Sequence, residues 1–208
     1  MKLIDINTWD RKTHYEFFKR MDYPQYNICT NIDITRFLPA VKQKQLPFYY
    51  AMIYAATYVL NNMEAFRYRS RNQQVVLHDK VHPSFTAMSP TSDLFKLVVT
   101  PLEGLPETFA QNAKKQAAAQ TQFITKEAVG RDDVIYITCV PWVTFTHISH
   151  TISLNKDDSI PRISWGKYFP GGDKILLPFS VQAHHSFVDG IHIGRYIDSL
   201  QKYLDNSK

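Results

Sequence analysis

Near its C-terminal end the chain reads Pro178-Phe179-Ser180-Val181-Gln182-Ala183-His184-His185-Ser186-Phe187-Val188-Asp189-Gly190. The apolar run from Lys174 to Ala183 is typical of a buried strand, because a strand covered on both faces loses its polar alternation. Asp189-Gly190 is a turn signal, and the apolar residues after it recur at helical spacing. This segment therefore predicts a strand that ends in two histidines, then a short loop, then a helix.

A loop held between rigid elements is where catalytic side chains are often found. Histidine is the side chain best suited to act as a general base near neutral pH. The same pattern also fits one ring packed in a core beside a second ring satisfied on the loop. Metal-ligand residue types are present, but no HExxH or Cys/His set supports a zinc site, so we predict no metal. No GxSxG sequence is present to indicate a serine hydrolase.

The composition indicates a globular protein. Of 208 residues, 44% are hydrophobic and 21% charged, which predicts one α/β domain over residues 1–208 with a sizeable core. The net charge of +5 is scattered, which argues against nucleic-acid binding and suits an anionic small ligand. The two cysteines are expected to be buried free thiols. The longest apolar stretch, Phe48 to Leu60, is too short to span a bilayer, and no signal-peptide pattern opens the chain. We expect a cytoplasmic protein with no membrane partner.

Periodicity predicts the remaining elements. Helices are expected over 11–20, 48–63 and 101–122, and strands over 26–35, 81–88, 95–100 and 134–140, with 142–148 continuing extended. Residues 66–78 resemble a hairpin, in which Arg67, Arg69 and Arg71 alternate as on one exposed face.

The sequence His184-His185-x-x-x-Asp189-Gly190 is similar to the signature of chloramphenicol acetyltransferases and their relatives. This motif alone is shared by several coenzyme-A-dependent acyltransferases. Other segments resemble that family in the same order, nearly from end to end: Trp9 to Phe17, Asn31 to Thr35, Leu46 to Tyr49, His82 to Thr86, Pro141 to Thr146, Gly166 to Tyr168 and Leu176 to Pro178.

The resemblance implies a single-domain coenzyme-A-dependent acyltransferase-like fold of the α/β class, with a mixed sheet packed against helices. It implies a homotrimer whose active sites lie at subunit interfaces. His185 would be the general base, taking a proton from a hydroxylated acceptor, by default chloramphenicol, as that oxygen attacks the thioester of acetyl-CoA. No acyl-enzyme would form. Asp189 would pair with Arg11 as scaffolding, tying the histidine loop to the first helix.

The resemblance also assigns residues around the base. The family has an oxyanion-binding serine where this chain has His147, and a threonine that holds an ordered water where this chain has Ser164. Loss of one oxyanion donor costs about 10²–10³ in turnover. We therefore keep open another hydroxylated acceptor, or slow turnover of chloramphenicol. A protein of this fold that only binds a ligand is a third reading.

Five further positions match residues of the family's substrate pockets. Lys167 and Tyr168 would line the coenzyme entrance, and Phe18, Tyr26 and Phe95 would line the acceptor pocket. A surface lysine and plain core aromatics are the alternative interpretation of the same positions.

Overall fold

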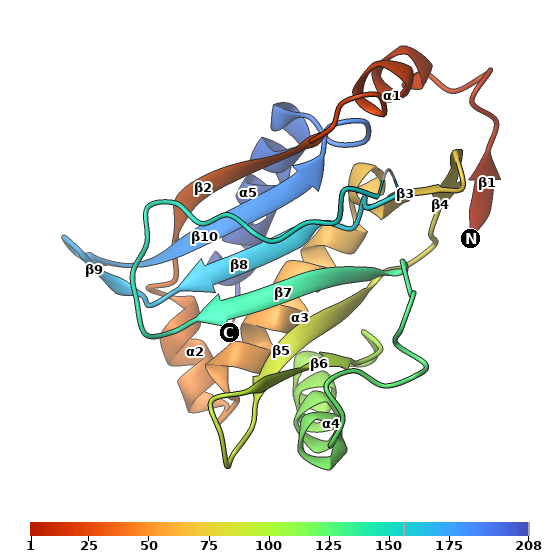
Figure 1. Cartoon of the computed structure of the whole chain (residues 1–208). Helices are drawn as coiled ribbons and strands as arrows, with labels where there is room; N and C mark the ends of the chain where they lie inside the picture. Colours follow the sequence, from red (N-terminus) through yellow and green to blue (C-terminus); the bar gives the residue numbers. More distant parts are fainter. Residues whose placement is uncertain (156, 208) are drawn as a thin grey trace.

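The computed structural model describes residues 1–155 and 157–207. Its main feature is a mixed sheet in the order β2-β10-β8-β7-β5-β6, with β9 paired to β10 (Figure 1). Strand β7 pairs in parallel with β5 and β8, and the other pairs are antiparallel. The strands are β2 (Gln25–Asp33), β5 (His82–Met88), β6 (Phe95–Val99), β7 (Val134–Val140), β8 (Arg162–Gly166), β9 (Phe169–Gly171) and β10 (Lys174–His184). The predicted fold class is confirmed.

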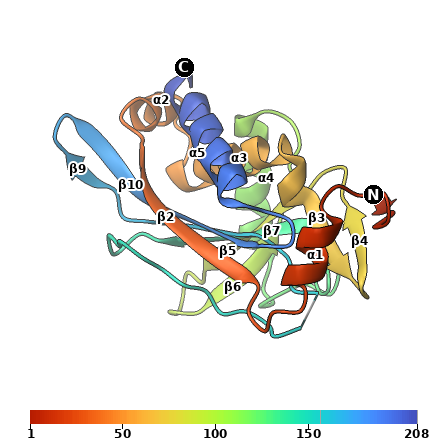
Figure 2. The same cartoon turned by 90° about the horizontal axis from the view of Figure 1, so that it is seen from above.

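Helices cover one face of this sheet. Helix α3 (Phe48–Asn61) is apolar on nearly all sides and is buried, with α5 (Gly190–Asp205) beside it (Figure 2). The side chains that they cover alternate along the strands, among them Phe85, Ile137, Ile163 and Phe179, all at most 1% exposed. This apolar layer is the hydrophobic core. None of the helices in the described part of the chain is long and apolar enough to cross a membrane.

The opposite face of the sheet is polar, yet it is also covered. Ser164, Ser180 and Gln182 point to that side and are at most 1% exposed. They are covered by residues 141–155 and 157–161, which cross in front of β8 and β10 (Figure 1). The prediction that 142–148 continues as extended structure is wrong, because no strand forms there. The segment is held by side chains instead of by a ladder of backbone hydrogen bonds.

Three contacts hold the crossing segment on the polar face. Asn27 Nδ2 donates to the Ile148 carbonyl at 2.6 Å. Arg162 makes a double hydrogen bond to Asp158 at 3.1 and 2.8 Å, with both side chains only 9% exposed. Gln25 Nε2 donates to the Asp158 carbonyl at 2.6 Å.

A small second sheet, β1-β4-β3, contains β1 (Lys2–Ile4), β3 (Tyr68–Arg71) and β4 (Gln74–Leu77). The prediction that its arginines share an exposed face is wrong for Arg69, which is 0% exposed. The Arg69 guanidinium donates to the carbonyls of Phe66, Tyr68, Asp132 and Val134. Arg69 therefore joins this sheet to the start of β7.

Several helices begin or end at residues other than those predicted. Helix α1 spans Lys12–Phe18, and α4 spans Pro106–Ala119, starting at a proline suited to the first turn of a helix. Helix α2 (Phe37–Gln43) was not predicted at all. Residues 64–67 form a 3₁₀ turn before β3.

Candidate active site

Strand β10 carries His185 to the loop that precedes α5. The backbone N–H of His185 donates to the Pro24 carbonyl at 2.9 Å, which fixes the main chain. Its ring stacks on Phe18, with centroids 4.1 Å apart and planes 6° apart, and lies 4.5 Å from the ring of Tyr26. The side chain is 35% exposed although Nδ1 is buried, so the exposed part is the opposite edge, which carries Nε2.

Arg11 ties this loop to the start of α1. Its Nη1 and Nη2 donate to the two carboxylate oxygens of Asp189 at 2.7 and 3.1 Å. Its Nε and Nη2 also donate to the carbonyls of Ser186 and His185. The hydrogen bond from Arg11 lowers the pKa of Asp189, so the carboxylate is ionised at neutral pH. The ion pair expected between these two residues is present.

The carboxylate of Asp189 also faces the histidine. Its Oδ1 lies 3.3 Å from Nδ1 of His185, outside the geometry of a hydrogen bond. A negative charge at this distance favours the tautomer with the proton on Nδ1, which leaves the Nε2 lone pair on the exposed edge. That is the arrangement a general base needs.

The neighbouring histidines have supporting positions. His184 is 3% exposed, and its Nδ1 accepts from the backbone N–H of Ser186 at 3.2 Å. His192 Nδ1 accepts from the backbone N–H of Asp189 at 2.9 Å, and burial lowers the pKa of His192. This contact closes the N-terminus of α5. Asp189 and His192 occupy the N-cap and N3 positions of a capping box, although the usual sequence signal has Glu or Gln at N3.

A second group of predicted residues lines a large cavity. The cavity measures about 1080 Å³, and its lining comes from the sheet, the first turn of α3, helix α4 and the crossing segment. Four of the predicted site residues line it: Phe95, Ser164, Lys167 and Tyr168. Most of the remaining wall is aromatic or aliphatic, as in many sites for small organic ligands.

Ser164 has an unexpected partner in this cavity. Its hydroxyl lies 2.9 Å from Nε2 of His150, which also lines the cavity. Burial lowers the pKa of His150, and the nearby charge of Arg162 lowers it further, so the ring is neutral at pH 7. Sequence analysis missed His150, because a single histidine in a segment expected to be extended carries no motif.

His147 belongs to neither group. It is exposed, and its Nδ1 lies 3.9 Å from the thiol of Cys29 on β2. Cys29 and Cys139 are both free, but the prediction that they are buried is wrong, because both are partly exposed. Burial raises the pKa of Cys139 to about 12, which keeps that thiol protonated.

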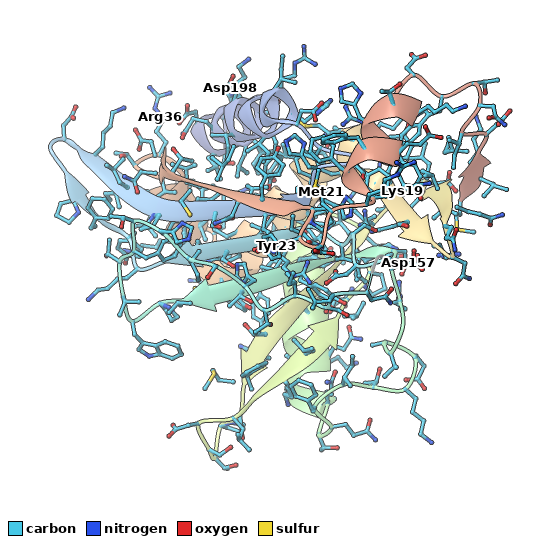
Figure 3. The ribbon with its side chains drawn as sticks, turned by 45° about the horizontal axis from the view of Figure 1, so that its top comes forward. Lys19, Met21, Tyr23, Arg36, Asp157 and Asp198 are labelled. Atoms are coloured by element: carbon cyan, nitrogen blue, oxygen red, sulfur yellow. The ribbon has the colours of Figure 1, made fainter. Side chains whose placement is uncertain are left out.

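Within one chain, nine of the ten predicted site residues fall into two separate groups, and His147 lies in neither. Arg11, Phe18, Tyr26, His185 and Asp189 gather where α1 meets the end of β10, and four others line the cavity. Lys19, Met21 and Tyr23 belong to the connection from α1 to β2 (Figure 3). Exposed apolar side chains occur along this edge and on the crossing segment: Phe17, Met21, Tyr23, Ile28, Trp142, Val143 and Leu154. Strand β2 is also an unpaired sheet edge.

Comparisons with known proteins show the family of this chain. The family model described as chloramphenicol acetyltransferase matches residues 1–201. A chloramphenicol acetyltransferase from Klebsiella sp. is 30% identical over 203 residues, covering 97% of this chain and 93% of the relative. One from Proteus mirabilis is 28% identical, covering 98% and 94%. The chain belongs to the chloramphenicol acetyltransferase family.

Solved structures show how far this fold extends. A chloramphenicol acetyltransferase superposes with a TM-score of 0.89 at 24% identity, covering 98% of this chain and 99% of that one. The cubic core of the pyruvate dehydrogenase multienzyme complex gives a TM-score of 0.71 at 18% identity, covering 93% and 86%. As a chloramphenicol acetyltransferase family member, the chain is an enzyme of the acyltransferase class.

Proposed function

We propose that this enzyme transfers an acetyl group from acetyl-CoA to a hydroxyl of chloramphenicol, with His185 as the general base and without an acyl-enzyme. The observation that carries the proposal is the His185 ring. It is clamped between Phe18 and Tyr26, has Nδ1 facing Asp189, and has its Nε2 edge exposed. Nε2 would accept the proton of the acceptor hydroxyl as that oxygen becomes a nucleophile.

Asp189 and Arg11 would act by positioning. Both carboxylate oxygens of Asp189 are bound by Arg11, and the same guanidinium reaches two carbonyls of the histidine loop. This network fixes the backbone that carries His185, and the negative charge stabilises the imidazolium formed when Nε2 is protonated. Burial raises the pKa of Tyr26 to about 12, so its phenol stays neutral beside the base.

The cavity would receive the coenzyme and part of the acceptor. Lys167 carries a positive charge suited to the phosphates of coenzyme A, and Tyr168 offers an aromatic face. Phe95 would contact the acceptor from the cavity side, and Phe18 and Tyr26 from the His185 side. Ser164 is the proposed polar group near the reacting carbonyl oxygen, whereas His147, the other residue proposed for this role, lies beside Cys29 outside the cavity lining. The donor thioester supplies the acetyl group, and the protein supplies orientation and the proton acceptor.

We propose further that the active enzyme is a homotrimer. The separation of the His185 group from the cavity supports a site that combines one group from each of two neighbouring copies. The exposed apolar side chains of α1, β2 and the crossing segment, together with the unpaired edge of β2, fit a surface that another copy covers.

Thiol release tests the activity. Purified enzyme with acetyl-CoA and chloramphenicol should release free coenzyme A, detected with a chromogenic disulfide, and acetylated drug should appear by mass spectrometry. A panel of other hydroxylated compounds serves as comparison. Absence of thiol release with every acceptor in the panel would contradict the proposal.

A second candidate is acetyl transfer to a different hydroxylated acceptor, with slow turnover of chloramphenicol. The observation that favours it is His147, which stands in place of the family's serine and lies beside Cys29 outside the cavity lining. Under this alternative another acceptor in the panel gives the higher kcat/KM. His147→Ser should then raise turnover of chloramphenicol, whereas unchanged turnover would remove the oxyanion argument.

Mixed oligomers test the shared site. Trimers that combine His185→Ala copies with Lys167→Glu/Tyr168→Ala copies should regain activity, although each variant alone is inactive. With random mixing, about a quarter of the sites receive an intact half from each neighbour. The two variants are denatured together, refolded and assayed against each variant refolded alone. No recovery in oligomers shown by mass to contain both chains would place the whole site within one copy.

A further inference from the structure

We infer that His150 is an additional substrate-binding residue, whose Nδ1–H donates a hydrogen bond to an oxygen of the substrates held in the cavity. This inference rests on the proposed function, because it takes the cavity to be the substrate site. It assigns a role to a residue outside the predicted set.

The first step is the proton on the ring. Ser164 is 0% exposed, and within the described residues its hydroxyl has one hydrogen-bond partner, Nε2 of His150 at 2.9 Å. A buried hydroxyl hydrogen without an acceptor costs about 1–3 kcal/mol. Ser164 therefore donates to Nε2, and the neutral imidazole carries its own proton on Nδ1.

The second step is where Nδ1 lies. In the part of the chain that the structure describes, Nδ1 of His150 has no hydrogen-bond partner, and it is not among the enclosed unpaired atoms. His150 lines the cavity together with Ser164, Phe95 and Lys167. The Nδ1–H group is thus a free donor on a wall that is otherwise mostly apolar, which is where a single polar contact orients a ligand.

The third step is the kind of atom that it binds. An N–H donor pairs with an oxygen lone pair, and the positive charge of Lys167, which lines the same cavity, favours an oxygen that carries negative charge. Two substrate oxygens meet this description: the carbonyl oxygen of the thioester, which gains charge during acyl transfer, and an oxygen of the acceptor. The experiment below distinguishes them.

The tautomer is measured by long-range ¹H–¹⁵N NMR of the full-length enzyme above pH 7.5, with the His150 signals assigned by their loss in His150→Asn. His150 should show a protonated Nδ1 and an unprotonated Nε2. Ser164→Ala should shift the ring toward the Nε2–H form. A protonated Nε2 in the unaltered enzyme would overturn the inference, whatever the activity.

Two substitutions separate the two ring nitrogens. The amide nitrogen of His150→Asn approximates the position of Nδ1 and keeps the donor. The longer amide side chain of His150→Gln reaches toward Ser164 instead, so the donor at the position of Nδ1 is lost. His150→Gln should therefore be impaired about tenfold or more, and His150→Asn should retain most of the function. Melting temperature checks that both variants are folded.

Calorimetric binding identifies the oxygen. A weaker Kd for chloramphenicol in His150→Gln, with unchanged Kd for coenzyme A, assigns the contact to the acceptor. A lower kcat with both Kd values unchanged assigns it to the thioester oxygen. If kcat and both Kd values of His150→Gln stay within about twofold, the inference is wrong. Failure of the proposed function is distinct, because it appears as no thiol release by the unaltered enzyme, while the tautomer is still measurable.

Discussion

His185→Gln should lower kcat for thiol release by about 10³–10⁴-fold, near the upper range for loss of a general base. Glutamine fills most of the space between Phe18 and Tyr26, so the aromatic clamp is not left empty. It cannot accept the acceptor's proton, because an amide has no basic nitrogen. Steady-state assays with saturating acetyl-CoA and chloramphenicol give kcat.

Two controls identify the lost step as proton transfer. Melting temperature and the Kd for coenzyme A should stay close to those of the unaltered enzyme, since Arg11 still holds Asp189 and the loop carbonyls. Turnover within about tenfold of the unaltered enzyme would show that His185 is not the base.

Arg11→Ala should reduce the free energy of unfolding by about 3 kcal/mol, the lower part of the range for breaking a buried ion pair. The lower part applies because the two side chains keep 17% and 28% exposure. The change leaves the Asp189 carboxylate and the carbonyls of His185 and Ser186 without their donor. Denaturant unfolding at pH 7 measures the difference, and kcat should fall with it because the histidine loop is freed.

The pH dependence gives a second test of the same pair. The Arg11 hydrogen bond lowers the pKa of Asp189 in the folded protein. The stability that the ionised carboxylate contributes is therefore fully present above the unfolded pKa of about 4. It is lost as pH falls through the lower, folded-state pKa. The gap in stability between the unaltered enzyme and Asp189→Asn should therefore be constant from pH 5 to 7 and shrink below about pH 4.

A matched control comes from an exposed pair. Lys44 and Glu107 lie 3.3 Å apart with 47% and 41% exposure, so Glu107→Ala should cost no more than about 1 kcal/mol. Equal losses from Arg11→Ala and Glu107→Ala would mean that Arg11 is an ordinary surface charge.

The sequence predicted most of what depends on local pattern. The apolar run ending at His184 and the strand over 134–140 follow from periodicity, and they form as expected. The turn expected at Asp189-Gly190 lies earlier, at residues 185–187, and Asp189 and Gly190 instead form the N-cap and the first residue of α5. The Arg11–Asp189 pair came from the resemblance, since nothing local links positions 178 residues apart.

The sequence did not predict which residues are buried by segments that lie far away along the chain. Arg69 alternates like an exposed arginine, and only the packing of β3 against the start of β7 surrounds it with carbonyls. Gln182 is buried as the apolar run from Lys174 to Ala183 predicts, but the irregular crossing segment that covers it and Ser164 was not predicted. Helix α2 is short and contains Pro39 early in its span, so its periodic signal is weak.

The crossing segment has a consequence for how substrates enter. The side chains of Asn27, Gln25 and Arg162 hold this segment, which has no regular secondary structure, by hydrogen bonds. The Arg162–Asp158 ion pair among them is almost completely buried. These bonds end on carbonyl and carboxylate oxygens of the segment and leave its N–H groups outside any ladder, so its amide protons should exchange faster than those of the sheet strands beneath it. Any displacement of this segment as substrates enter would therefore leave the pairing of the sheet strands intact.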